Sequence, residues 1–210
     1  MPDTLLIERR AGVSHVTLNR PESRNAMSLA MVDELIAALR AAEEAGDRAI
    51  VLRGAGGHFC SGGDIKDMGA AQGAEASNGV DPIAKVNARF GALCAAYAST
   101  GLPVVAVVEG AVMGGGFGLT CVADLVIASQ TAVFRLPETG LGLVPAQIAP
   151  FLVERLGFSE AKRLAVTGGK IDAGEALKLR LVHDVQPTEK LDEALDAALA
   201  QIRKGAPEAI

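Results

Sequence analysis

The sequence predicts an α/β fold, because short apolar segments of strand length alternate with amphipathic segments of helix length along most of the chain. Two of the strand segments, 49–52 and 104–108, are each followed by a turn rich in glycine. A repeated succession of strand, turn and helix builds a parallel sheet that is covered by helices. No stretch has the composition of a linker, so the pattern indicates one domain.

The expected elements follow from this alternation. In chain order they are strands over 5–10 and 13–18, a polar loop over 19–25, a helix over 29–45, a strand over 49–52, a mobile loop over 68–81, a helix over 83–100, a strand over 104–108, a helix that starts at the glycines 114–116, strands over 125–128 and 132–136, and helices over 148–156, 159–166, 173–179 and 191–203.

Several of these elements end at a local signal. Gly12 closes a hairpin turn between the first two strands. The Ser28 hydroxyl can accept a hydrogen bond from the first turn of the helix that follows, and Gly46 ends the apolar repeat of that helix. Gly101 and Pro103 end the next helix before the strand that follows it.

Length and hydropathy place the chain among single-domain proteins that work in water. Its 210 residues are enough for one well-packed core, and no apolar run reaches the ~20 residues needed to cross a bilayer. The first residues have no basic segment before an apolar stretch, so no secretory signal is visible. We therefore expect a cytoplasmic protein that has no membrane partner.

Charge and side-chain chemistry exclude further classes. A formal charge of −5, with one tyrosine and no tryptophan, argues against a nucleic-acid surface, which needs a basic stripe and stacking aromatic rings. The three cysteines, Cys60, Cys94 and Cys121, are far apart, so neither a disulfide framework nor a cysteine-based metal site is predicted. The three histidines are scattered without metal-ligand spacing, and we expect no metal.

The glycine-rich turns carry the functional signal. Residues 114–116 are three consecutive glycines, and residues 59–65 contain Gly62 and Gly63. A glycine has no Cβ, so such turns can bring a ligand against bare backbone N–H groups. Two of these donors on one oxygen would form an oxyanion hole for a carbonyl that gains negative charge, so the chain is predicted to act on an acyl group.

These turns belong to a longer series of motifs. The series comprises Asn19-Arg20-Pro21, Arg24-Asn25-Ala26-Met27-Ser28, Phe59-Cys60-Ser61-Gly62-Gly63-Asp64-Ile65, residues 110–116, Asp124 and Leu136-Pro137-Glu138. Together the motifs resemble the enoyl-CoA hydratase/isomerase superfamily, the crotonase fold, over nearly the whole chain. The resemblance implies a spiral of ββα units, an acyl-CoA thioester as substrate, and no cofactor beyond the CoA that the substrate carries. It also implies a homotrimer or a dimer of trimers.

The same resemblance implies a division of the chain and a set of site residues. Residues 1–190 would form the crotonase-like core domain, and residues 191–210 the start of a C-terminal helical region that is incomplete. Gly63 and Gly115 would supply the two N–H groups of the oxyanion hole, and Glu138 the catalytic carboxylate. The residues expected to bind substrate or CoA are Arg24, Ala26, Ser61, Gly62, Asp64, Ile65, Lys66 and Gly114.

One position departs from the family pattern. Hydratases of this family typically carry a first catalytic glutamate two residues after the triple glycine, where this chain has Gly118. Glu138 alone must then handle both proton transfers, or leave one of them to substrate or solvent. An apolar pocket is expected to raise its pKa. The lining of that pocket would be Phe134, Leu136, Leu141 and Leu143.

The segment 142–151 points to a substrate class. Its Pro-Ala-x-Ile-x-Pro pattern is similar to that of hydratases of branched glutaconyl-CoA thioesters, the 3-methylglutaconyl-CoA and isohexenylglutaconyl-CoA enzymes, which implies addition of water across an α,β double bond. Two alternatives stay open. One is a Δ3,Δ2-enoyl-CoA isomerase, for which one carboxylate suffices, and the other is a catalytically weak acyl-CoA-binding member of the family.

Overall fold

The structure is a computed structural model that describes residues 4–64 and 82–209. Its strands are β1 (Leu5–Arg10), β2 (Val13–Leu18), β3 (Ala49–Gly54), β4 (Val104–Val108), β5 (Ala111–Met113), β6 (Leu125–Ser129), β7 (Val133–Arg135), β8 (Lys170–Asp172) and β9 (Asp184–Gln186). Six of them form one sheet of order β1-β2-β3-β4-β6-β9, in which β1 and β2 are antiparallel and all other pairs are parallel. A second sheet has the order β5-β7-β8.

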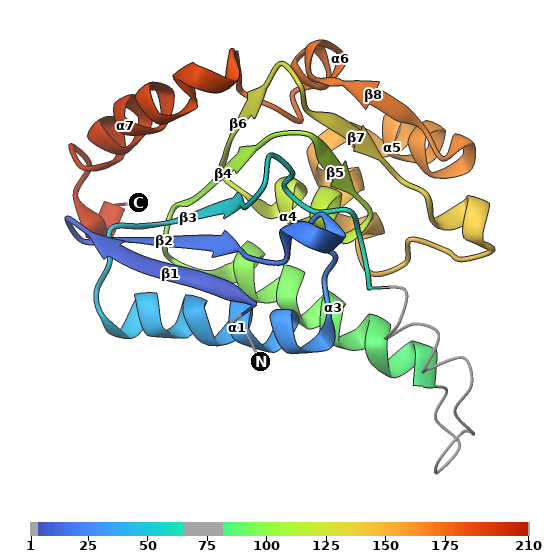
Figure 1. The fold of residues 1–210 in the computed structure, drawn as a ribbon, viewed down its shortest axis with the longest axis horizontal. Helices are drawn as coiled ribbons and strands as arrows, with labels where there is room; N and C mark the ends of the chain where they lie inside the picture. The colour runs from blue at the N-terminus through green and yellow to red at the C-terminus, as the bar shows by residue number, and fades with distance from the viewer. Residues whose placement is uncertain (1–3, 65–81, 210) are drawn as a thin grey trace.

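Helices lie on both faces of the larger sheet (Figure 1). The helices of the described residues are α1 (Leu29–Glu44), α3 (Pro82–Ser99), α4 (Gly115–Val122), α5 (Ala149–Thr167), α6 (Ala173–Lys178) and α7 (Leu191–Ile202), with short 3-10 helices at η1 (Pro21–Ser23), η2 (Glu138–Leu141), η3 (Thr188–Lys190) and η4 (Pro207–Ala209). α1 and α3 run below the sheet in Figure 1, and α7 crosses its opposite face. Among the described helices, none is both long and apolar enough to span a membrane.

Alternation within the strands explains why both faces of the sheet are covered. In β3, Ile50 and Leu52 belong to the larger hydrophobic core, whereas Ala49 and Val51 belong to a smaller core on the other face. A parallel strand that is buried on both faces therefore reads as a continuous apolar run. α7 closes the smaller core with leucines at helical spacing, namely Leu191, Leu195 and Leu199.

The chain adds one strand to each sheet and then a helix, turn after turn. β4, β5 and α4 form one such unit, and β6, β7 and α5 form another. One turn earlier, Cys60 extends the smaller sheet through a parallel bridge to Val112, between β3 and α3. The structure therefore confirms the predicted α/β class and its spiral of ββα units.

Most predicted ends agree with the structure. Ser28 caps α1 as expected, because its Oγ accepts a hydrogen bond from the Met31 N–H at 3.2 Å. The two helices predicted over 148–156 and 159–166 correspond to the two parts of α5, which are separated at Gly157, where φ is +75° and ψ is 161° and the backbone is not helical. The predicted mobile loop over 68–81 lies outside the described residues.

Three strands were not predicted. β5 lies where a turn was expected, and β8 and β9 follow helices without a strand signal. Each has three residues, which is too short to show an alternating pattern. These strands form because neighbouring segments offer hydrogen-bonding partners, which a local pattern does not reveal.

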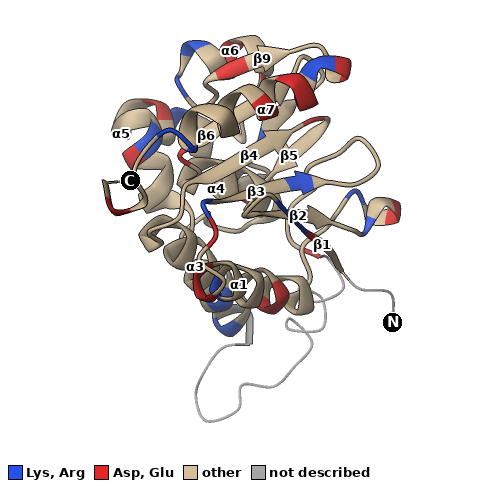
Figure 2. Ribbon diagram, turned by 90° about the vertical axis from the view of Figure 1, so that its left-hand side faces the viewer, with Lys and Arg blue, Asp and Glu red and all other residues tan. Residues whose placement is uncertain are grey.

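Charged side chains are spread over the outer surface. On the side shown in Figure 2, Lys and Arg residues are interleaved with Asp and Glu residues over the helices, without a continuous basic stripe in the described part of the chain. This distribution is consistent with the net charge of −5.

Candidate active site

The two predicted glycine turns lie against each other at the carboxyl ends of β3 and β4. The Cys60 N–H donates to the Ala111 carbonyl and the Met113 N–H donates to the Cys60 carbonyl, both at 2.9 Å. Beyond this bridge the backbones stay close, since an ideal Cβ on Gly114 would lie 3.5 Å from the Gly62 Cα. Segments that are far apart in the sequence thus form one backbone surface.

The N–H of Gly63 points away from the segment of Met27, with which Gly63 is paired. Met27 and Gly63 form a parallel bridge, in which the Met27 N–H donates to the Gly62 carbonyl at 2.8 Å and the Asp64 N–H donates to the Met27 carbonyl at 3.0 Å. Backbone groups alternate in direction along such a segment, so the Gly63 N–H points to the other side. Within residues 4–64 and 82–209 this N–H has no hydrogen-bond partner.

Gly115 is the first residue of α4, where backbone N–H groups have no partner inside the helix. The residue before it, Gly114, caps the helix with φ +49° and ψ −113°, a conformation that favours glycine. The Gly114 N–H is already bonded to the Arg135 carbonyl at 3.0 Å. Gly115 therefore presents a donor at the positive end of the helix dipole.

Glu138 lies beside this turn. An ideal Cβ on Gly114 would lie 2.8 Å from the Glu138 Oε1, so the carboxylate sits against bare backbone. Its Oε2 is buried and has no hydrogen-bond partner among the described residues. Burial raises the pKa of Glu138, as the sequence predicts. Phe134 and Leu136, which are close to Glu138 in the sequence, are buried. Leu141 is 66% exposed, so the expectation that it encloses the carboxylate is wrong.

Position 118 has no room for a second carboxylate. An ideal Cβ on Gly118 would lie 2.5 Å from the Ile148 Cγ2 and 3.5 Å from the Cys94 Sγ. Ile148 and Cys94 are both buried, so neither can move aside freely. Close packing between α4 and the segment that leads into α5 therefore explains why position 118 is a glycine and not the glutamate of the two-glutamate pattern.

Two contacts with α3 shape the site and were not predicted. The Phe90 ring covers the second turn, because an ideal Cβ on Gly115 would lie 2.9 Å from its edge. One residue later, Gly91 leaves room for the Gln147 side chain, whose Oε1 would be 2.2 Å from a Cβ at that position. Both contacts join segments that carry no common sequence signal, and only tertiary packing reveals them.

A mostly buried ion pair holds the first turn. The Arg20 Nη1 lies 2.7 Å from the Asp64 Oδ2 and donates to the Ala26 carbonyl at 2.6 Å. Asp64 is thus engaged with the protein beside Gly63, and its predicted role in ligand binding stays a prediction. Asn25 supports the same loop, because its side-chain amide donates to the carbonyls of Ala55 and His58.

Arg24 and Ser61, which are predicted to bind CoA, lie at the first glycine turn and are hydrogen-bonded to each other through the backbone. The Ser61 N–H donates to the Arg24 carbonyl at 3.0 Å, and the Ser61 Oγ donates to the Ser23 carbonyl at 2.9 Å. Arg24 is exposed, so its guanidinium is accessible to an anionic group. Ile65 and Lys66 lie outside the described residues, and their predicted contacts stay predictions.

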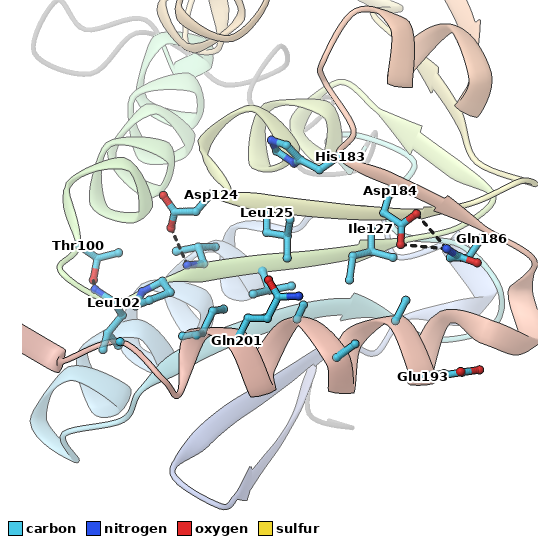
Figure 3. A pocket seen from close by; sticks show the side chains of 18 of the residues that line it. Thr100, Leu102, Asp124, Leu125, Ile127, His183, Asp184, Gln186, Glu193 and Gln201 are labelled. Carbon is cyan, nitrogen blue, oxygen red and sulfur yellow. Dashed lines mark hydrogen bonds between the residues drawn. The ribbon is translucent and has the colours of Figure 1, made fainter. Parts of the chain in front are cut away.

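A cavity of about 950 Å³ lies elsewhere, between α7 and strands β4, β6 and β9 (Figure 3). Two of its lining carboxylates accept hydrogen bonds within the protein: Asp124 accepts one from the Val104 N–H at 2.7 Å, and Asp184 accepts two from the Gln186 amide. None of the predicted site residues is among its described lining, so this cavity is separate from the glycine turns. No group of three or more potential metal ligands occurs in the described part of the chain.

Comparison with known sequences identifies relatives. A family model described as enoyl-CoA hydratase/isomerase matches residues 8–210. A curated protein of Rhodobacter capsulatus, named probable enoyl-CoA hydratase, is 38% identical over 204 residues, which are 96% of this chain and 76% of that protein. A mitochondrial 3-hydroxyisobutyryl-CoA hydrolase of Rattus norvegicus is 33% identical over 198 residues, which are 93% of this chain and 50% of the hydrolase.

Solved structures agree with the sequence comparison. An enoyl-CoA hydratase/isomerase from Marinobacter aquaeolei matches with a TM-score of 0.94 at 51% identity, over 98% of this chain and 79% of that chain. A protein from Thermobifida fusca YX, solved in complex with CoA, matches with a TM-score of 0.87 at 32% identity, over 99% of this chain and 81% of that chain.

Replacement of Gly118 by alanine is expected to destabilise the fold by about 1–3 kcal/mol, because the new Cβ would overlap the Ile148 side chain in a close-packed core. Denaturant unfolding of Gly118→Ala, Ile148→Ala and the double variant measures the coupling between the two positions. Loss of the Ile148 Cγ2 should remove most of the penalty at position 118. Strictly additive changes would contradict this explanation of Gly118.

Replacement of Glu138 by glutamine is expected to raise the Tm at neutral pH, because partial burial of the carboxylate, with no described partner for Oε2, disfavours its anion. A carboxyl whose pKa is raised on folding stabilises the protein below its usual pKa of 4.5, and this stability is lost as the pH rises through the folded-state pKa. The advantage of Glu138→Gln should therefore be absent at acidic pH and reach about 1 kcal/mol, roughly 2–4 °C, at neutral pH.

Thermal unfolding across this pH range measures the effect. The matched control is Glu44→Gln on the exposed end of α1, which should change the pH dependence little. A Tm difference for Glu138→Gln that does not vary with pH would show that the carboxylate is not desolvated in the folded protein.

Proposed function

The chain belongs to the enoyl-CoA hydratase/isomerase family, and from this premise we propose that it is a hydro-lyase that adds water across the α,β double bond of an acyl-CoA thioester. One observation carries the proposal. The partly buried carboxylate of Glu138, whose buried Oε2 has no described hydrogen-bond partner, lies against the glycine turn that presents the Gly115 N–H. A desolvated base next to backbone donors is the arrangement that enolate chemistry requires.

The oxyanion hole would act on the thioester carbonyl. Its oxygen would lie between the N–H groups of Gly63 and Gly115, which the backbone holds in fixed directions. Negative charge moves onto this oxygen when a nucleophile adds to Cβ and an enolate forms. Donors that are already oriented stabilise this charge without reorganisation, and the loss of one such donor typically lowers kcat by about 10²–10³-fold.

Glu138 would carry both proton transfers. Its carboxylate would take a proton from water as the hydroxyl group adds to Cβ, and the resulting carboxylic acid would return a proton to Cα of the enolate. The net change is the addition of one water molecule, and Glu138 ends as the carboxylate. A raised pKa suits this double role, because it makes the carboxylate a better base and keeps the acid available near neutral pH.

The loop over 19–27 is proposed to receive the CoA portion. Arg24 is exposed and is hydrogen-bonded through its carbonyl to Ser61, so a cation lies next to the first glycine turn. The similar protein from Thermobifida fusca YX, solved with CoA, supports this ligand class. We further propose Lys66 as a second cation, a homotrimer or dimer of trimers as the assembly, and the cytoplasm as the compartment.

A branched glutaconyl-CoA thioester is the proposed substrate. A second catalytic glutamate would repel the distal carboxylate of such a substrate, and at position 118 the packing of Ile148 leaves no room for one. The segment 142–151, which contains Gln147 and Ile148, also resembles that of hydratases for these substrates. The hydro-lyase proposal does not depend on this finer assignment.

A second candidate is a Δ3,Δ2-enoyl-CoA isomerase, and the position of Glu138 at the second glycine turn, with glycine at position 118, favours it. One carboxylate can carry a proton between Cα and Cγ without adding water. Mass analysis distinguishes the two reactions, because hydration adds one water to the substrate and isomerisation does not. The panel is crotonyl-CoA, a 3-enoyl-CoA, 3-methylglutaconyl-CoA and isohexenylglutaconyl-CoA.

We expect clear hydration of a glutaconyl thioester and weak hydration of crotonyl-CoA. Glu138→Gln should lower kcat by more than about 10²-fold while thioester binding persists, because the amide keeps the shape but cannot accept the proton. Steady-state kinetics and a binding titration measure the two effects. Double-bond migration without water uptake would favour the isomerase, and a variant that keeps most of kcat would exclude Glu138 as the base.

Gly114→Ala should lower kcat by about 10²-fold or more, because its Cβ would displace the Glu138 carboxylate from the turn. Its control is Gly46→Ala, since Gly46 also has a positive φ, +64°, but has open space around it, away from the turns. Both variants should lose some stability through backbone strain, whereas only Gly114→Ala should lose activity. Equal activity losses after correction for the folded fraction would contradict the placement of Glu138.

A further inference from the structure

Cys60 lies where the two glycine turns contact each other. Its side chain is fully buried, and its backbone makes the bridge to Val112 that joins the first turn to the second. The thiol has no role in the proton transfers proposed above. Its position nevertheless places the sulfur between the two turns that would bind the thioester oxygen.

The Cys60 sulfur contacts the backbone of both turns. The Gly62 N–H donates to Sγ at 3.4 Å, and the thiol hydrogen can return a bond to the Gly62 carbonyl at 3.7 Å. The Gly116 backbone also lies against Cys60, since an ideal Cβ on Gly116 would lie 3.3 Å from Sγ. A single atom is therefore shared by two segments that are otherwise distant in the sequence.

These two partners are the direct neighbours of the proposed oxyanion donors. Gly62 precedes Gly63, and Gly116 follows Gly115. We infer that Cys60 is a positioning residue, whose sulfur sets the separation and direction of the Gly63 and Gly115 N–H groups. This inference rests on the proposed function of the two turns.

Sulfur suits this role for two reasons. Its hydrogen bonds are longer than those of oxygen, so one sulfur reaches both turns at distances that a hydroxyl would not span equally well. Burial raises the pKa of the Cys60 thiol to about 11, so it stays protonated and places no negative charge beside the developing enolate.

A positioning role for Cys60 predicts an effect on kcat that a role in core packing alone does not predict. Cys60→Ala would leave the Gly62 N–H without its acceptor and open a gap beside Gly116, so both turns would relax. Cys60→Ser would keep an acceptor but with shorter contacts. We expect kcat to fall by about 10–100-fold in Cys60→Ala, with a smaller fall in Cys60→Ser and little change in KM, because the sulfur does not touch the CoA portion.

A conjugated dienoyl-CoA thioester provides a readout that needs no turnover. Its absorption shifts to longer wavelength when hydrogen bonds polarise the carbonyl, so the size of the shift reports the two N–H groups directly. Cys60→Ala should bind the thioester with similar affinity but lose most of the red shift, and Cys60→Ser should keep part of it. Cys121→Ala is the control, since Cys121 is also a buried cysteine, and its shift should match that of the wild type.

The possible outcomes separate the role of Cys60 from the proposed reaction. A lower Tm with a full red shift and full kcat in Cys60→Ala and Cys60→Ser would overturn the positioning role and leave only packing. A wild-type protein that shows the red shift but hydrates no thioester would overturn the hydratase proposal, while the comparison of Cys60 variants would still stand. A wild-type protein that binds the thioester without any red shift would overturn both the oxyanion hole and the role of Cys60.

Discussion

Backbone pairing between loops is the constraint on which the proposed active site depends. Two parallel bridges, Cys60 with Val112 and Met27 with Gly63, bring three loops together without any contribution from a long strand. Because each bridge uses the backbone groups on one side of its segment, it directs the intervening N–H groups to the other side. The proposed donor of Gly63 would thus follow from the hydrogen bonds that assemble the loops, and the ion pair between Arg20 and Asp64 reinforces this arrangement at one end.

Sequence reasoning could predict those parts of the site that have a local signal. The glycine turns have a local signal in their runs of glycine after a strand, Glu138 is indicated by the resemblance of its motif to the family, and the structure brings Gly62, Gly114 and Glu138 together. The positions of Phe90 and Ile148 could not be predicted in this way, since an aromatic and an aliphatic residue in helical segments look like ordinary core. Likewise β5, β8 and β9 are too short to have a period of their own.

The contact between Gly118 and Ile148 links packing to chemistry. A buried aliphatic side chain at 148 and a glycine at 118 are complementary in volume, so neither position can change alone without a cavity or an overlap. A chain with this pair is committed to one carboxylate at the glycine turns. Under the proposed function, the absence of a second charge at position 118 would remove electrostatic repulsion toward an anionic acyl group.

The spiral of ββα units also determines when the site can form. Its contacts join distant parts of the chain, as when the His58 ring accepts a hydrogen bond from the Ala111 N–H across 53 residues. Closing such long loops costs chain entropy before the contacts compensate for it, so parallel pairings of this kind form late in folding. A chain in which these long-range pairings have not formed lacks the contacts that align the two turns, so activity would report their formation rather than the folding of any one segment.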